Sequence, residues 1–238
     1  MGKQKRNGEL AGRAVVYLLM GAMLVATGYL TVKGTAEFVM SSQMKTEERC
    51  VVIDAGHGGD DPGKVGINGA LEKEINLQIA QKIKGLLESE GIRVVMTRTD
   101  DNGLYDNGAE NKKVQDMKRR IEQIEEEAPL LTVSIHQNSY PEEYVKGAQV
   151  FYYKDSVESE KAAEIMQKSL KERLDEENKR EAKANTSYYL LKKTSSPTII
   201  VECGFLSNND EAEKLTREAY QEKVAWAVFM GIMQTLNA

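Results

Sequence analysis

The feature that most constrains the fold is a short apolar run that stops abruptly in a glycine-rich segment. Residues Cys50–Ile53 are apolar and mostly β-branched, which is typical of a strand buried on both faces. The segment from Gly56 to Gly63 holds four glycines and a proline, so a loop is predicted there. His57 lies in this loop, and the whole chain contains only two histidines. In sheets of such strands, functional sites form beyond the carboxyl ends of the strands.

Strand patterns and helix patterns alternate along the rest of the chain. Further strands are predicted at residues 92–98, 130–135, 148–153, 188–191 and 198–201. Helices are predicted at residues 71–90, 117–127, 159–183 and 210–236, where apolar side chains recur at spacings of three and four. This alternation predicts an α/β fold, in which helices cover a mostly parallel sheet.

Three polar side chains directly follow predicted strands. They are His57, His136 and Glu202. Because the carboxyl ends of parallel strands lie at one edge of a sheet, these side chains are expected to meet there. The simpler interpretation of His57, a solvent-exposed side chain in a tight turn, does not account for a second histidine in the same situation.

Glu72 extends the apolar stripe of the first predicted helix. It precedes Ile75 by three residues, so its carboxylate is expected on the inward face of the helix. A buried carboxylate needs a partner, because an unpaired buried charge is costly. The alternative is an acid in the first turn that is favoured by the helix dipole alone.

These residue types suit a zinc hydrolase. Two histidines and one glutamate are the protein ligands of catalytic zinc sites that keep a fourth position open for water. A second glutamate can take a proton from that water and return it to a leaving amine, while zinc polarises a carbonyl oxygen. Other mechanisms have less support, because the chain has no Gly-x-Ser-x-Gly sequence and Cys203 follows an acid that would raise its pKa.

The first 48 residues predict a membrane anchor and a connector. Residues 1–13 are basic, residues 14–32 are an uncharged run of nineteen, and residues 33–48 are a linker to a catalytic domain at 49–238. About 20 apolar residues cross a bilayer, and a basic flank stays in the cytoplasm. We therefore expect a transmembrane signal anchor and an extracytoplasmic catalytic domain in the cell envelope. The alternative is a cleaved signal peptide, whose apolar core is usually shorter, and a secreted protein.

Charge and cysteine content restrict the class of protein further. After residue 42, 27 Lys and Arg residues stand against 35 Asp and Glu residues, a net charge near −8, which argues against nucleic-acid binding. Cys50 begins a predicted strand and Cys203 follows the end of another, so they are expected at opposite edges of the sheet. A disulfide needs Cα atoms within about 7 Å, so both thiols are expected to be free.

The motifs of the chain resemble those of the N-acetylmuramoyl-L-alanine amidases of the Amidase_3 family. They are Asp54-Ala55-Gly56-His57-Gly58-Gly59, Leu71-Glu72-Lys73, Thr97-Arg98, Ser134-Ile135-His136-Gln137-Asn138 and Val201-Glu202-Cys203-Gly204-Phe205-Leu206-Ser207-Asn208, in the family's order. By position, the resemblance implies that His57, Glu72 and His136 bind Zn2+ and that Glu202 is the catalytic general base. It implies hydrolysis of the amide between N-acetylmuramic acid and L-alanine in peptidoglycan. It also implies a mixed sheet of about six strands, flanked by helices.

A membrane anchor followed by a bare catalytic domain resembles the CwlD-type amidases of endospore-forming bacteria. That resemblance implies a role in the spore cortex, where removal of stem peptides prepares muramic acid for lactam formation. Gln137 departs from the small residue that many members carry, and its side chain is expected either to hydrogen-bond near the metal or to narrow the cleft. Three alternatives are a peptidoglycan-binding regulatory domain with a vestigial site, an enzyme that an accessory envelope protein activates, and a zinc peptidase that acts on proteins.

Overall fold

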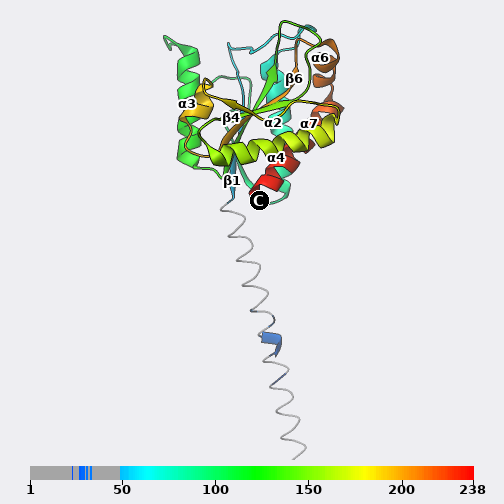
Figure 1. Ribbon diagram of the computed structural model, residues 1–238. Helices are drawn as coiled ribbons and strands as arrows, with labels where there is room; N and C mark the ends of the chain where they lie inside the picture. Colours follow the sequence, from blue (N-terminus) through cyan, green and yellow to red (C-terminus); the bar gives the residue numbers. More distant parts are fainter. Residues whose placement is uncertain (1–22, 24–26, 30, 32, 34–48) are drawn as a thin grey trace, which may run out of the picture. The chain divides into compact units, whose positions relative to one another are not determined.

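The computed structural model of the chain describes residues 23, 27–29, 31, 33 and 49–238 (Figure 1). The predicted basic terminus, signal anchor and linker lie almost entirely outside these residues and stay predictions. Within the described part, no helix is long and apolar enough to span a membrane. The segment Glu47–Ala238 forms a compact unit with its own hydrophobic core.

Strands and helices alternate within residues 49–238, as predicted. The strands are β1 (Cys50–Ala55), β2 (Arg93–Met96), β3 (Leu131–Asn138), β4 (Gln149–Tyr153), β5 (Lys183–Asn185) and β6 (Thr198–Phe205). The helices are α2 (Glu72–Ser89), α3 (Lys112–Glu127), α4 (Val157–Leu174), α5 (Tyr189–Lys193), α6 (Asn209–Leu215) and α7 (Glu218–Leu236).

The six strands form one mixed sheet in the order β2-β1-β3-β6-β4-β5. The first four strands in this order run parallel, β4 runs antiparallel to β6, and β5 runs parallel to β4. The carboxyl ends of β1, β3 and β6 therefore lie side by side at one edge. Cys50 begins β1 and Cys203 lies near the end of β6, and both thiols are buried and free, as predicted.

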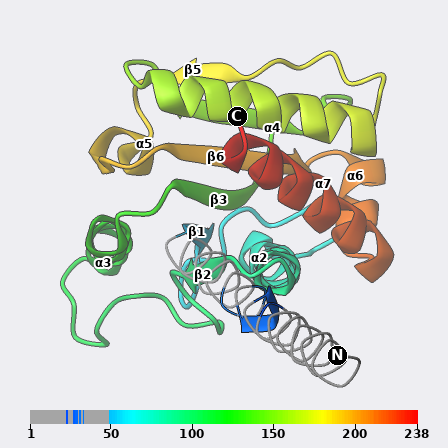
Figure 2. The same cartoon turned by 90° about the horizontal axis from the view of Figure 1, so that it is seen from below.

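Helices cover both faces of the sheet (Figure 2). On one face, α2 packs on β1 to β3, α4 packs on β4 and β6, and α7 packs against α2 and α4. On the other face, α3 packs on β1, and α5 packs on β4 and β6. The side chains of β1 divide between these layers, because Val51 and Ile53 join the larger core while Val52 joins the smaller one. The central strands are buried on both faces, as their continuous apolar runs predict.

The strand predicted at residues 188–191 is wrong, because this segment opens the short helix α5. Leu190 and Leu191 are both buried, and the amides of Lys192 and Thr194 bond back to carbonyls four residues earlier. A run this short carries no periodicity that separates a strand from one helical turn. The strand beside β4 at this edge of the sheet is β5, which sequence analysis missed because its side chains are largely exposed.

The predicted helix boundaries change at three places. The helix predicted at 210–236 is divided into α6 and α7, where the Gln221 side chain donates to the carbonyl of Leu215 at the end of α6. α4 ends at Leu174, nine residues before the predicted end at 183. α3 begins at Lys112 rather than 117, because the Asn111 side chain accepts a hydrogen bond from the Val114 amide and caps the helix.

Candidate metal centre and active site

The carboxyl ends of three strands bring the four predicted residues into one pocket. His57 lies in the loop after β1, and His136 in β3 is the register partner of Glu202 in β6. Glu72 is the first residue of α2 and is buried rather than solvated, so the helix-dipole interpretation alone does not describe it.

The two histidines converge on the carboxylate of Glu72. Its Oε1 atom lies 3.2 Å from His57 Nε2 and 2.9 Å from His136 Nδ1. One ligand atom from each of the three residues lies within 4.8 Å of the other two. Ligand atoms of a tetrahedral zinc ion are roughly 3.3 Å apart, given bonds of about 2.0–2.2 Å. The spacing and the donor types therefore fit a metal ion.

Two glycines leave room for this cluster. A Cβ atom on Gly56 would lie 2.3 Å from ring atoms of His136, and one on Gly63 would lie 2.5 Å from Glu72 Oε2. Gly63 also has a φ of 68°, in the left-handed region where glycine is favoured. His57 itself has a φ of 64°, an uncommon conformation for a residue with a side chain. The glycine-rich motif is therefore a steric requirement of the cluster.

Hydrogen bonds outside the cluster orient the ligands. Asp61 Oδ2 lies 2.9 Å from His57 Nδ1, so the other ring nitrogen is left facing Glu72. The backbone amides of Lys64 and Gln137 donate to the two oxygens of the Glu72 carboxylate, at 2.8 and 3.1 Å. Asn76, one turn along α2, donates to the carbonyl of Gly56 at 3.1 Å.

The side chain of Gln137 is buried and bonds near the centre, which is the first of the two predicted outcomes. Its Nε2 atom donates to Asn76 Oδ1 at 3.1 Å, and Asn76 Nδ2 lies 3.4 Å from Glu72 Oε1. Gln137 thus connects β3 to the helix that carries a ligand, as supports of metal sites commonly do.

Comparison with known proteins agrees with this geometry. Residues 51–234 match the Amidase_3 family, described as N-acetylmuramoyl-L-alanine amidase. The chain belongs to this amidase family. The protein is therefore an enzyme, and peptidoglycan is the substrate of its family.

Individual relatives of the amidase resemble it over most of their length. The germination-specific N-acetylmuramoyl-L-alanine amidase of Bacillus subtilis is 36% identical over 189 residues, which cover 78% of this chain and 79% of the relative. The CwlD amidase of Clostridioides difficile, solved in complex with the GerS lipoprotein, is 41% identical, with a TM-score of 0.77 over 79% of this chain and 98% of that one. The amidase AmiC2 of Nostoc punctiforme is 32% identical, with a TM-score of 0.69 over 80% and 98% of the two chains.

The two glutamates of the amidase pocket have opposite electrostatic environments. Burial alone would raise the pKa of Glu72, but hydrogen bonds and charge interactions with His136 and His57 outweigh burial and hold this pKa well below its ordinary value. Burial raises the pKa of Glu202 to about 7, and the nearby carboxylate of Glu72 adds to this effect against the two histidines. Glu202 Oε2 is buried and has no hydrogen-bond partner in the described residues. Glu72 is therefore suited to bind a cation, and Glu202 to exchange a proton at neutral pH.

A buried arginine that sequence analysis missed supports the histidine loop. Arg120 in α3 donates to Asp54 Oδ1 at 2.6 Å and to the carbonyl of His57 at 2.6 Å. Its Nε atom donates to Asp116 at 2.6 Å, and it is almost fully buried. One signal was available, because Arg120 precedes Ile124 by four residues and so lies on the inward stripe of the predicted helix.

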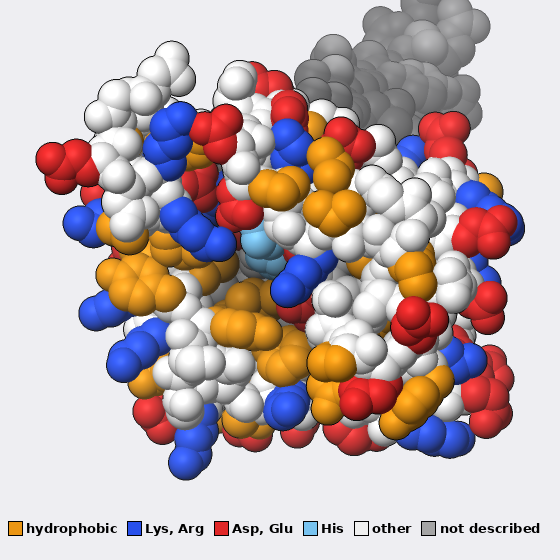
Figure 3. Space-filling model, turned by 90° about the horizontal axis from the view of Figure 1, so that it is seen from above, with side chains coloured by type: hydrophobic (Ala, Val, Ile, Leu, Met, Phe, Trp, Pro, Cys, Tyr) orange, Lys and Arg blue, Asp and Glu red, His pale blue; other side chains and the backbone are white. Residues whose placement is uncertain are grey.

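The pocket is a hollow of about 570 Å³ with the cluster inside it. Figure 3 looks into it and shows a histidine at its floor, hydrophobic side chains along one side and basic side chains on two sides. Its apolar lining includes Met117, Tyr188, Tyr189 and Leu190. Tyr188 and Tyr189 come from the segment predicted as a strand, so their place in the pocket was not foreseen. Helix α5 therefore forms part of the wall of the active-site pocket.

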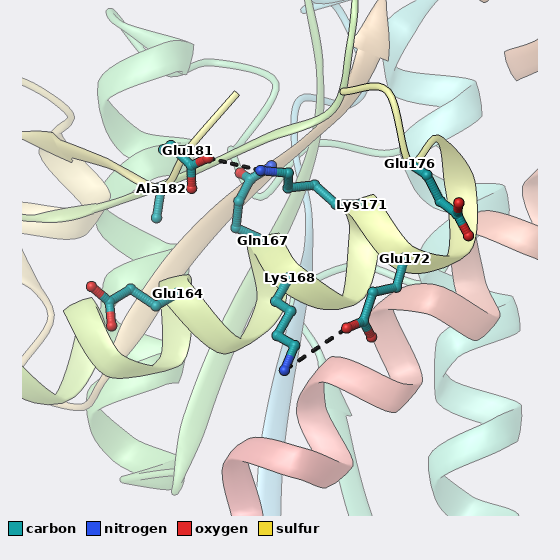
Figure 4. A pocket seen from close by; sticks show the side chains of 8 residues that line it. All are labelled: Glu164, Gln167, Lys168, Lys171, Glu172, Glu176, Glu181 and Ala182. Carbon is teal, nitrogen blue, oxygen red and sulfur yellow. Dashed lines mark hydrogen bonds and ion pairs between the residues drawn. The ribbon is translucent and has the colours of Figure 1, made fainter. Parts of the chain in front are cut away.

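A second hollow, of about 530 Å³, lies along α4 beside the segment that leads into β5 (Figure 4). Its charged side chains are largely paired with one another, since Lys171 bonds Glu181 at 2.7 Å and Lys168 lies 3.8 Å from Glu172. It contains no histidine, and the Gln167 side chain is hydrogen-bonded to the Ala148 carbonyl and the Val150 amide. This hollow has no feature of a catalytic site.

Proposed function

We propose that this amidase is a zinc enzyme in which His57, Glu72 and His136 bind the ion and Glu202 is the general base and acid. The observation that carries the proposal is the unpartnered, buried carboxylate of Glu202 in the pocket of the His-Glu-His cluster. A buried oxygen without a partner destabilises a fold, so its presence calls for an explanation, and a catalytic role is one. Imidazole nitrogens with one carboxylate suit zinc, whose catalytic sites use this ligand set.

The residues of the chain account for the proton transfers of amide hydrolysis. When bound, zinc would lower the pKa of a coordinated water to about 7 and polarise the scissile carbonyl. Glu202 accepts the proton of the attacking water, and its pKa of about 7 allows both protonation states at neutral pH. Glu202 then donates this proton to the nitrogen of the departing L-alanine. The bond cleaved is the amide between the lactyl group of N-acetylmuramic acid and L-alanine.

The cellular setting that we propose is the spore cortex, with the catalytic domain outside the membrane and anchored by residues 14–32. The name of the Bacillus subtilis relative, a germination-specific amidase, supports a role in spores. The uncharged N-terminal run supports the anchor, and secretion after cleavage is the alternative. The Clostridioides difficile relative forms a complex with a lipoprotein, which supports an accessory envelope protein for this chain.

Glu202→Gln tests the proposed function. The full chain should keep its zinc, because Glu202 is not a ligand, and should lose about 10²–10⁴-fold in turnover of muropeptides. Metal analysis and mass spectrometry of the digests provide the two readouts. His57→Ala and His136→Ala should instead lose zinc. Wild-type turnover by Glu202→Gln, or full zinc occupancy in both histidine variants, would contradict the assignment of roles.

A further inference from the structure

One lysine at the mouth of the active-site pocket has no acidic partner. Lys64 and Lys113 both line the pocket, and both side chains are exposed. Lys113 lies 3.5 Å from Asp61, which also bonds His57. Lys64 forms no ion pair within the described residues, although acidic residues outnumber basic ones in this domain. Lys64 is therefore a cation that is available to a ligand.

The backbone of Lys64 is fixed beside a proposed metal ligand. Its amide donates to Glu72 Oε2 at 2.8 Å, and its carbonyl accepts a hydrogen bond from the Glu72 amide at 3.0 Å. The Cα atom of Lys64 thus has a defined place next to the reaction centre, while the side chain remains in solvent. A charged side chain on a rigid backbone can recognise a ligand without much loss of backbone entropy.

The three aspartates of the pocket already have cationic or histidine partners, so they do not compete for this cation. Asp54 and Asp116 are both bonded to Arg120, and Asp61 is bonded to His57. The wall formed by Tyr188 and Tyr189 is aromatic, and Lys193 Nζ lies 5.9 Å from the centre of the Tyr189 ring. The pocket therefore has basic side chains at its rim and a hydrophobic side, which Figure 3 shows.

The stem peptide carries a matching group. In peptidoglycan, L-alanine is followed by a D-glutamate linked through its γ-carboxyl, so the α-carboxyl of that residue is either free and negative or amidated and neutral. Two residues of extended chain span roughly 7 Å, so this group stays within about 7 Å of the scissile amide. The backbone of Lys64 bonds the Glu72 carboxylate of the cluster, so its side chain starts close to that amide. We propose that Lys64 binds this α-carboxylate and selects stem peptides in which it is not amidated. The proposal rests on the proposed amidase reaction at this site.

Steady-state kinetics with two muropeptides test the proposal. They are N-acetylmuramoyl-L-alanyl-γ-D-glutamate, with a free α-carboxylate, and its α-amide, each given to the zinc-loaded full chain. The wild type should show a KM about five- to tenfold lower for the free acid, with similar kcat, because the contact is made before and during reaction. Lys64→Met should remove this preference, and Lys64→Arg should restore it.

Two further variants serve as comparisons. Lys113→Met should change the preference less, because Asp61 already neutralises part of that charge. Lys168→Met, in the second hollow on α4, should leave both KM values unchanged. The proposal would be overturned if Lys64→Met kept the wild-type preference for the free acid. It would also be overturned if the substitution raised KM equally for both muropeptides.

A binding measurement separates this proposal from the proposed function. Calorimetry with the dipeptide L-alanyl-γ-D-glutamate and its α-amide reports recognition without turnover. Tighter binding of the free acid to wild type than to Lys64→Met supports the proposal, even if neither muropeptide is hydrolysed. Absence of hydrolysis would contradict only the proposed reaction. Equal binding of the two dipeptides to wild type would overturn the proposal for Lys64 even if both muropeptides are hydrolysed.

Discussion

Arg120 Nη2 donates a hydrogen bond to the carbonyl oxygen of His57 at 2.6 Å, so helix α3 holds the backbone of a proposed metal ligand. The same guanidinium bonds the buried carboxylate of Asp54 at the end of β1. Through these contacts, Arg120 joins helix α3 to strand β1 and to the loop that carries His57, at the edge of the sheet where the pocket opens.

Arg120→Met should be strongly destabilising. Removal of one partner from a buried ion pair typically costs about 3–5 kcal/mol, because the other charge is left buried and unpaired. Urea unfolding measures this loss of free energy. The neighbouring Arg119→Met is a matched control, since Arg119 pairs with Asp106 at an exposed position and should cost about 0–1 kcal/mol. Equal effects of the two substitutions would refute the structural role of Arg120.

Asp54 should make the fold sensitive to acid. Burial alone would raise its pKa, but Arg120 and hydrogen bonds from Ser134 and Thr97 outweigh burial and hold the pKa well below its ordinary value. A carboxyl group with a lowered folded-state pKa contributes stability above its unfolded pKa of about 4, and this contribution is lost as the pH falls. The free energy of unfolding of the wild type should therefore fall between pH 5 and pH 2. Asp54→Asn should be less stable at pH 7, and its free energy of unfolding should fall less over the same pH range. An equal fall in the variant and the wild type would contradict the role of Asp54.

Asn76→Ala and Gln137→Ala should weaken zinc binding without removing a ligand. Both side chains belong to the hydrogen-bonded chain that ends at the Glu72 carboxylate. Loss of such supporting groups typically costs about 10–100-fold in metal affinity or activity. Competition with a chelator measures the zinc dissociation constant. Gln81→Ala, on the exposed side of the same helix, is the control and should bind zinc as the wild type does; a shift as large in this control would count against the prediction.

Gly56→Ala should disrupt the centre sterically. The added methyl group would lie 2.3 Å from ring atoms of His136, so the ring or the loop must move. Zinc content and amidase activity should both fall sharply. Gly85→Ala in α2 is the matched control, because a Cβ there meets nothing within 4 Å. Alanine in a helix interior should stabilise that variant by about 0.5–1 kcal/mol. Normal zinc content in Gly56→Ala would show that the loop adapts.

Much of the fold and of the candidate site could be predicted from the sequence because the signals were local. Apolar runs such as Cys50–Ile53 report burial on both faces directly, and the order of the elements follows from their alternation. His57, His136 and Glu202 each follow a predicted strand, so their convergence needs only that the strands be parallel neighbours, which the structure confirms for β1, β3 and β6. In the structure β3 and β6 extend past their predicted ends and include His136 and Glu202.

The remaining features depend on tertiary contacts that no short stretch specifies. Two partners of Arg120, the Asp54 carboxylate and the His57 carbonyl, lie 66 and 63 residues earlier in the chain, and only Asp116 is a local partner. The apolar residues of α5 carry too few turns to show a helical period, so their strand prediction was wrong. The antiparallel direction of β4 likewise follows from its pairing with β6 rather than from its composition.

The proposed metal ligands and the proposed base come from different regions of the chain, because the base lies on β6, the last strand in the sequence. The three proposed metal ligands are complete once residue 136 has been made, and β1 and β3 are direct neighbours. The proposed base arrives only with β6, which inserts between β3 and β4 although it is the last strand to be synthesised. A growing polypeptide can therefore gather its ligands well before it has the group that moves protons, and hydrolysis must await the synthesis of β6, which begins at residue 198.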